Sequence, residues 1–191
     1  MLNRTGILLG LVAFMLATAP GIHAQQTNRA ADRYTFRAGD EKQPLELVIS
    51  RWSTDAERDS VFQSVQKDPA KTMDTLKEPG TVGWIHLPGG LDHTIRYAKR
   101  VMRPDGSVDI VALAEGAVWI WWQPTAAAAD RSKDYNFTAI QLHMARSGVG
   151  EGKLSSSKVA ADKDAGIAIG DYAQEPALLT EVKRDPAARA S

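Results

Sequence analysis

Histidine side chains that could bind a metal ion occur at three places after the N-terminal segment. His86 and His93 flank a Pro-Gly-Gly turn and could face each other across it, and His143 lies on a later segment. With Asp92 they could form a zinc or copper site, because imidazole and carboxylate groups bind such metals. No pair has the spacing that fixes two ligands on one face of a strand or helix. Partly exposed packing histidines are therefore the alternative, and we expect no cofactor.

Serine and lysine follow the Ser-x-x-Lys pattern at residues 155–158. At the start of a helix this pattern places a nucleophile beside a base. Here it falls in a predicted strand, where the two side chains would lie about 10 Å apart. The companion Ser-Asp-Asn and Lys-Thr-Gly motifs are missing from the sequence. We therefore expect a solvated strand and a protein that is not an enzyme; the alternative is a hydrolase that uses His86, His93 or Asp92.

Tryptophan is concentrated in the segment 117–123, which is apolar on both faces of the strand that it predicts. Trp119 and Trp121 would share one face of that strand, and Trp84 lies on an earlier strand. The indole ring combines a large apolar area with a hydrogen-bond donor, which suits a ligand pocket. Trp119, Trp121 and Trp84 are therefore candidate ligand-binding residues. Packing in the core of a central strand is the alternative.

A basic run on one predicted strand consists of Arg96, Lys99, Arg100 and Arg103. Carboxylates that could pair with it stand on the strand that returns: Asp105, Asp109 and Glu115. Alternation along the strand divides the basic residues between two faces, so they form no continuous patch. We therefore expect a solvated and paired surface and no nucleic-acid partner.

The elements that must position these residues follow from hydrophobic periodicity. Strands are predicted over 33–38, 45–52, 82–87, 93–103, 108–114, 117–123, 137–145, 153–160, 166–172 and 178–183, with a glycine-rich turn over 148–152. After the second strand, Thr54 and Glu57 form a capping box for one helix, and Asp68-Pro69 begins a second. The fold class is mainly β (α+β by content), an antiparallel β-barrel or strongly coiled sheet with two short helices inserted after strand two as a lid or plug. A β-sandwich is the alternative.

The composition fits one globular domain of ordinary size. The chain has 191 residues, of which 43% are hydrophobic, with 23 basic and 23 acidic side chains. This excludes a mainly disordered protein and gives no basic excess for a polyanionic partner. The absence of cysteine from the sequence excludes disulfides and thiolate chemistry.

The N-terminus has the order of a secretory signal peptide. Arg4 precedes an apolar run over 6–19, Pro20 then breaks a helix, and Ala24 offers a small residue for cleavage. The apolar run is short for a membrane span, although an uncleaved anchor is the alternative. We therefore expect an exported protein, periplasmic or extracellular, with no membrane span after cleavage. The predicted organisation is a signal peptide (1–24), a flexible leader (25–32), a single β-rich domain (33–184) and a disordered tail (185–191).

Four segments resemble a family of uncharacterised secreted bacterial proteins, a domain of unknown function. They are LELVISRWSTDAERD, VGWIHLPGG, IRYAKRV before the PDG turn, and FTAIQLHMARSGVGEGKLS. The resemblance covers about residues 45–159. It implies an exported, β-rich protein and carries no site residue.

Together these patterns favour a non-enzymatic exported β-barrel that binds a small apolar or amphipathic ligand, with the Trp119 strand lining part of the cavity. One alternative is an envelope-associated interaction or inhibitor module, and another is the hydrolase with a His/Asp site. The ligand and the oligomeric state do not follow from the sequence.

Overall fold

The computed structural model describes residues 32–90, 92–116, 137–173 and 175–185. Within these ranges the strands are β1 (Asp32–Ala38), β2 (Leu45–Ile49), β3 (Gly83–His86), β4 (His93–Met102), β5 (Val108–Glu115), β6 (Phe137–Met144), β7 (Val149–Asp162), β8 (Gly166–Tyr172) and β9 (Ala177–Arg184). The helices are α1 (Asp55–Lys67), the short 3-10 helix η1 (Pro69–Lys71) and α2 (Thr72–Lys77).

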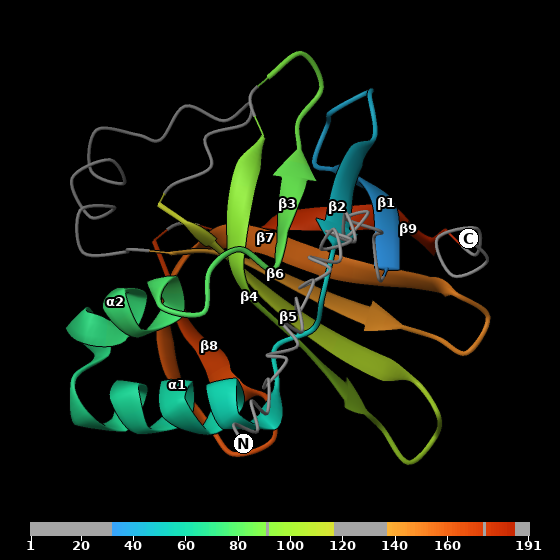
Figure 1. Ribbon diagram of the computed structural model, residues 1–191. Helices are drawn as coiled ribbons and strands as arrows, with labels where there is room; N and C mark the ends of the chain where they lie inside the picture. Colours follow the sequence, from blue (N-terminus) through green and yellow to red (C-terminus); the bar gives the residue numbers. More distant parts are fainter. Residues whose placement is uncertain (1–31, 91, 117–136, 174, 186–191) are drawn as a thin grey trace, which may run out of the picture.

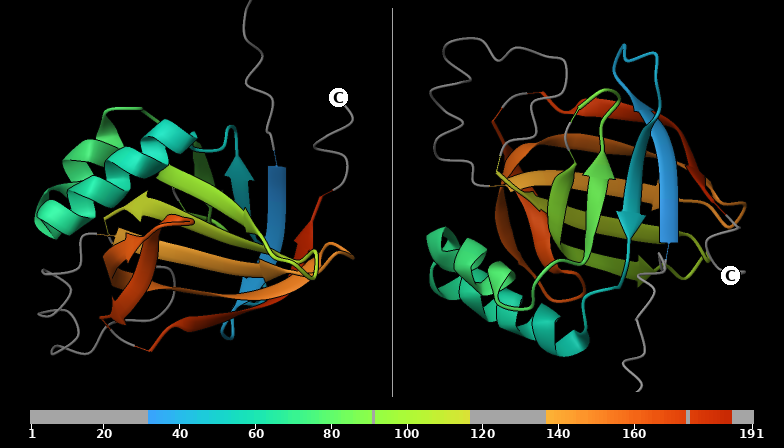
Figure 2. Two further views of the ribbon diagram at one scale, coloured as in Figure 1. Left: turned by 90° about the horizontal axis from the view of Figure 1, so that it is seen from below. Right: turned by 45° about the horizontal axis from the view of Figure 1, so that its top comes forward.

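Eight strands close into an antiparallel barrel (Figures 1 and 2). From β1 to β6 each strand pairs with the next along the chain; β6 then pairs with β7, β7 with β9, and β9 with β1. β8 is the additional strand, and among the described strands it pairs only with β7. The barrel prediction is confirmed, and the β-sandwich alternative is not the fold.

The length of β7 explains how β8 leaves the barrel. Residues 149–154 of β7 pair with β9, whereas residues 157–162 pair with β8. The β7–β8 hairpin therefore extends beyond the barrel wall and folds back over its outer face. There the hydroxyl of Tyr97 on β4 donates a hydrogen bond to the carbonyl oxygen of Ala165, at 2.6 Å.

The inward-facing side chains of all eight barrel strands form one buried hydrophobic cluster. Phe36, Leu47, Ile85, Ile110 and Ile140 are among its fully buried members. They alternate with outward-facing residues, as the period of two along each strand requires. Burial of each such side chain contributes about 1.5–3 kcal/mol. The lumen of the barrel is therefore occupied by the core of the protein.

The two helices pack against the outside of the barrel. The capping box at the start of α1 is present, since the Thr54 hydroxyl accepts from the Glu57 amide and the Glu57 carboxylate accepts from the Thr54 amide. Val61, Val65 and Leu76 form a second buried cluster with the outward-facing Tyr97. The helices lie beside the wall (Figure 2), so the expected lid or plug is not their position.

The second helix begins later than predicted. Pro69 starts η1 instead of an α-helix, and α2 follows from Thr72 without a side-chain cap at Lys71. Asp68-Pro69 therefore starts a 3-10 turn that α2 continues.

The N-terminal half of β7 corrects the prediction of a turn over residues 148–152. The turn ends at Gly148, and the strand begins at Val149. A Cβ atom at Gly150 or Gly152 would overlap a carbonyl oxygen of β6. These glycines therefore allow close approach of two strands.

The serines of β7 are buried, in contrast to the solvated strand predicted from the sequence. Ser155, Ser156 and Ser157 are almost fully enclosed, because β7 has neighbouring strands on both edges and α1 packed against it. The strand itself was predicted correctly, but a run of polar residues gave no indication of its burial.

Several predicted segments lie outside the described residues. They are the signal peptide, the leader up to residue 31, the tail from residue 186 and the tryptophan segment over 117–123. Asp32, predicted as the last leader residue, is the first residue of β1. Among the described residues, no helix has the length and hydrophobicity needed to cross a membrane.

Candidate functional site

The three histidines with metal-binding potential are not brought together. His93 pairs with Ile85 in the β3–β4 register and shares its inward face, whereas His86, the next residue after Ile85, faces outward. His143 stands on β6, with β4 and β5 between it and β3. The expectation that His86 and His93 face each other is therefore wrong. No group of three or more His, Asp or Glu side chains that could hold a metal ion occurs in the part of the chain that the structure describes.

His86 belongs to a local hydrogen-bonded group on the outer face of β3. Its Nε2 accepts from the indole N–H of Trp84, and its Nδ1 contacts a carboxylate oxygen of Asp92. A ring nitrogen that accepts a hydrogen bond is unprotonated, so the neutral ring carries its proton on Nδ1 and donates it to Asp92. In this structure both ring nitrogens of His86 are therefore engaged by neighbouring side chains.

A groove of about 740 Å³ lies on the outside of the barrel. Its floor is formed by outward-facing residues of β4, β5, β6 and β7. The β7–β8 hairpin forms one wall, and residues 178–181 of β9 form the other. This volume lies within the range of small-molecule binding sites.

Asp109 is the centre of the polar network in the groove. Its carboxylate binds the Arg103 guanidinium (Nε to Oδ2, 2.5 Å) and the Nδ1 of His143 (2.6 Å). Burial alone would raise the pKa of Asp109, but the hydrogen bonds from His143 and Arg103 outweigh it and hold the pKa below its ordinary value. His143 in turn faces Glu151 across the β6–β7 pair.

Apolar side chains complete the groove. Val101 and Val111 stand on its floor, and Ile169 lines the wall formed by β8. On the β9 side, Leu178 is 61% exposed, which is unusual for a large hydrophobic residue. The groove therefore offers both an apolar surface and a set of charged groups.

An irregularity of the sheet directs Glu181 of β9 to the edge of the groove. The register shifts around this residue in both the β1–β9 and the β7–β9 pairing, so Glu181 is the extra residue of a bulge. Its φ of 52° is the only positive value of a non-glycine residue in the described ranges. The carboxylate reaches Arg37 on β1 at 3.4 Å.

The basic run of β4 and the residue that follows it is paired in part as predicted. Lys99 pairs with Asp55 and Arg100 with Asp32, which the sequence did not indicate. Arg96 binds Glu115, and Arg103 binds Asp109. Asp105 instead accepts hydrogen bonds from the amide and hydroxyl of Ser107 within the turn.

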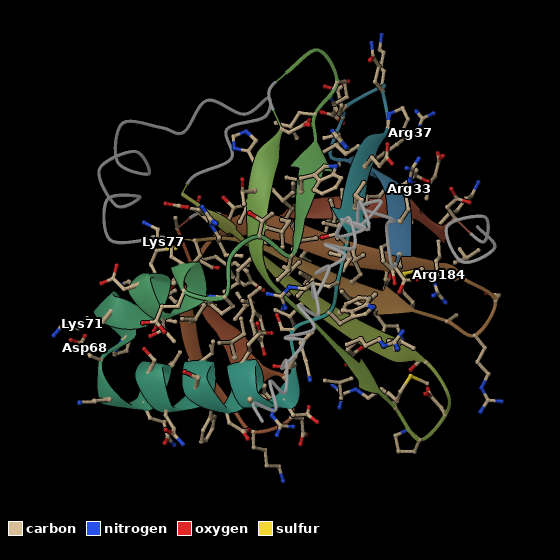
Figure 3. The ribbon with its side chains drawn as sticks, in the orientation of Figure 1. Arg33, Arg37, Asp68, Lys71, Lys77 and Arg184 are labelled. Atoms are coloured by element: carbon tan, nitrogen blue, oxygen red, sulfur yellow. The ribbon has the colours of Figure 1, made fainter. Side chains whose placement is uncertain are left out.

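One end of the lumen is closed by a cluster around Asp32, whose side chain is only 3% exposed. The carboxylate accepts from the indole N–H of Trp52 at 3.0 Å and from Nε of Arg184 at 2.6 Å. The Arg100 guanidinium stacks over Trp52, with 5.3 Å between its carbon and the ring centroid. In Figure 3, Arg184 lies on the side of β1 and β9, away from the helices. This cluster is structural, since its groups are bound to one another.

Of the three tryptophans predicted to bind a ligand, one lies in the described part of the chain. Trp84 stands half-buried on β3 and does not line the groove. Trp119 and Trp121 lie outside the described residues. The groove residues Glu151, Asp164 and Glu181 were missed, because single carboxylates on separate strands carry no motif.

Comparison with family models, with curated proteins and with solved structures gives no match for this chain. The resemblance to secreted bacterial proteins therefore stays a prediction, and function has to be argued from the groove and its residues.

Proposed function

We propose that this chain is an exported, non-enzymatic binding protein that holds a small amphipathic ligand in the groove on the outside of its barrel. The proposal rests on the difference between the lumen of the barrel and the groove on its outer surface. The lumen is occupied by buried side chains of all eight strands. The groove is open, measures about 740 Å³ and has a mixed lining.

The lining supports an amphipathic ligand over a purely apolar one. Val101, Val111 and Leu178 provide apolar contact, while Asp109 and Glu151 provide charge at the same surface. Sites for small molecules combine a hydrophobic surface with a few polar groups that orient the ligand. The sequence hypothesis placed the ligand against the Trp119 strand; the proposal now places it outside the barrel wall.

Binding in the groove is tested with 1-octanol as an uncharged probe. Amide chemical shifts in NMR spectra should change at the groove residues of β4 to β7 and β9. Val101→Trp should fill the floor and weaken binding by about tenfold or more. Met102→Trp is the matched control, since Met102 is the next residue of β4, is 65% exposed and does not line the groove. Equal binding by both variants, or shifts confined to lumen residues, would contradict the proposal.

The proposal that the protein is exported rests only on its N-terminal segment, residues 1–24. Expression of the full chain in a Gram-negative host should give a periplasmic product that begins at Gln25. Intact mass and N-terminal sequencing of the fractionated protein measure this directly. A product that keeps residues 1–24 in the membrane fraction would instead support the uncleaved anchor.

A further inference from the structure

We propose that the groove selects ligands with a cationic head group, so that its natural ligand is a small organic ammonium compound with an apolar chain. This inference rests on the proposed function and adds the chemical class of the ligand. Three features carry it: the balance of charges in the groove, the position of two carboxylates and the apolar surface beside them.

Carboxylates outnumber cations in the lining of the groove. The anionic side chains are Asp109, Glu151, Asp162, Asp164 and Glu181, and the cationic ones are Arg103 and Lys153. The charge of Arg103 is matched by Asp109, and Asp164 and Asp162 add to the field that raises its pKa. Among the described residues, neither Glu151 nor Asp164 has an ion-pair partner. The groove therefore carries a surplus of negative charge with Lys153 as its remaining cation.

Glu151 and Glu181 define the position of the head group. Gly150 pairs with Val182, and Gly152 pairs with Leu179, so Glu151 stands opposite the bulge that contains Glu181. Like charges directly opposite each other on neighbouring strands are destabilising, and a bound cation between them would reduce this repulsion. Arg37 supplies a positive charge to Glu181 alone, at 3.4 Å, and it is not part of the groove lining.

The apolar chain then has a defined place. Leu178 lies on β9 next to the bulge and pairs with Lys153 of β7, and Val111 lies further along the floor. An ammonium group between Glu151 and Glu181 would place its chain against Leu178. The row from Leu178 to Val111 then crosses Lys153 and Gln141, so Leu178 is the apolar residue nearest the head group. Burial of the exposed Leu178 side chain by the ligand adds a hydrophobic contribution to binding, because apolar surface is removed from water.

The charge preference is tested with three probes that share one chain: octylammonium, 1-octanol and octanoate. Isothermal titration at pH 7, below the micellar concentration of each probe, compares their affinities for the full chain. We expect octylammonium to bind most tightly and octanoate most weakly. High salt should weaken binding of octylammonium and leave that of octanol nearly unchanged, because ions screen exposed charges.

Variants then assign the preference to named residues. Glu151→Gln keeps the shape of the side chain. It should lower the affinity for octylammonium about fivefold and leave the affinity for octanol unchanged. Glu78→Gln is the matched control, since Glu78 is exposed at the end of α2 and outside the groove. Equal affinity for all three probes, or equal effects of the two variants, would overturn the cation preference and leave the groove as a binding site. Failure of all three probes to bind would overturn the proposed function itself.

Discussion

The phenolic hydroxyl of Tyr97 on β4 donates a hydrogen bond to the main-chain carbonyl of Ala165, 68 residues later in the chain. Both partners are buried, and burial raises the pKa of the Tyr97 hydroxyl. This contact fastens the tip of the β7–β8 hairpin to the outer face of the barrel. The hairpin forms one wall of the groove, so the bond helps to set the width of the groove.

Tyr97→Phe should therefore loosen the hairpin without emptying the core. The carbonyl oxygen of Ala165 would lose its partner in a buried place, which costs about 1–3 kcal/mol of unfolding free energy. Hydrogen exchange should accelerate in residues 162–169 more than in the barrel strands, and octanol should bind more weakly. Tyr172→Phe is the comparison, because its hydroxyl donates to Gln141 in a less buried position. Identical exchange rates in wild type and Tyr97→Phe would show that the hairpin is held by other contacts.

A second prediction concerns the charge cluster that closes one end of the lumen. Asp32→Asn removes the negative charge that faces Arg184 and Arg100. Breaking a buried ion pair by removing one charge is strongly destabilising, and we expect a loss of about 2–4 kcal/mol in urea denaturation. Glu46→Gln breaks the more exposed pair between Arg33 and Glu46 and should cost less than about 1 kcal/mol. Similar costs for the two variants would mean that Asp32 behaves as a surface residue.

Much of the barrel follows from local patterns. Alternation marked most of the strands, and Thr54 and Glu57 marked the start of α1 because a capping box is formed by residues that are close in sequence. The Pro-Asp-Gly turn fixed the hairpin of β4 and β5, which is why pairing between Arg103 and Asp109 could be expected.

The rest depends on contacts between distant residues. A register difference of a single residue places His86 and His93 on opposite faces of the sheet, and the turn sequence does not specify it. Gly150 and Gly152 resemble a turn in the sequence, although they are required by close approach to β6. The groove itself exists because β7 continues past its barrel partners and its hairpin reaches Tyr97, which no local pattern of residues indicates.

A third prediction concerns stability at acid pH. The folded-state pKa of Asp109 lies below its ordinary value, despite the opposing effect of burial, because His143 and Arg103 bind its charged form. Asp109 therefore stabilises the fold above its unfolded pKa of about 4, and this contribution disappears as the pH falls through the folded pKa. Asp109→Asn should be less stable than the wild type at neutral pH. Its free energy of unfolding should also fall less than that of the wild type as the pH is lowered below about 4. Carboxyl NMR titration measures the pKa directly, and a midpoint at or above the ordinary value would contradict this account.

The last prediction separates the stability of the bulge from its role in binding. Glu181 holds a positive φ of 52°, which glycine adopts without steric cost. Glu181→Gly should therefore stabilise the fold by up to about 1 kcal/mol, while octylammonium binds more weakly because a carboxylate beside the head group is lost. Glu181→Ala is the matched variant, since it removes the carboxylate but keeps the steric cost of the backbone. Both variants should lose the same affinity in titration, and only the glycine variant should gain in thermal unfolding. A gain in stability with unchanged affinity would show that Glu181 has no part in binding and that Glu151 alone faces the cation.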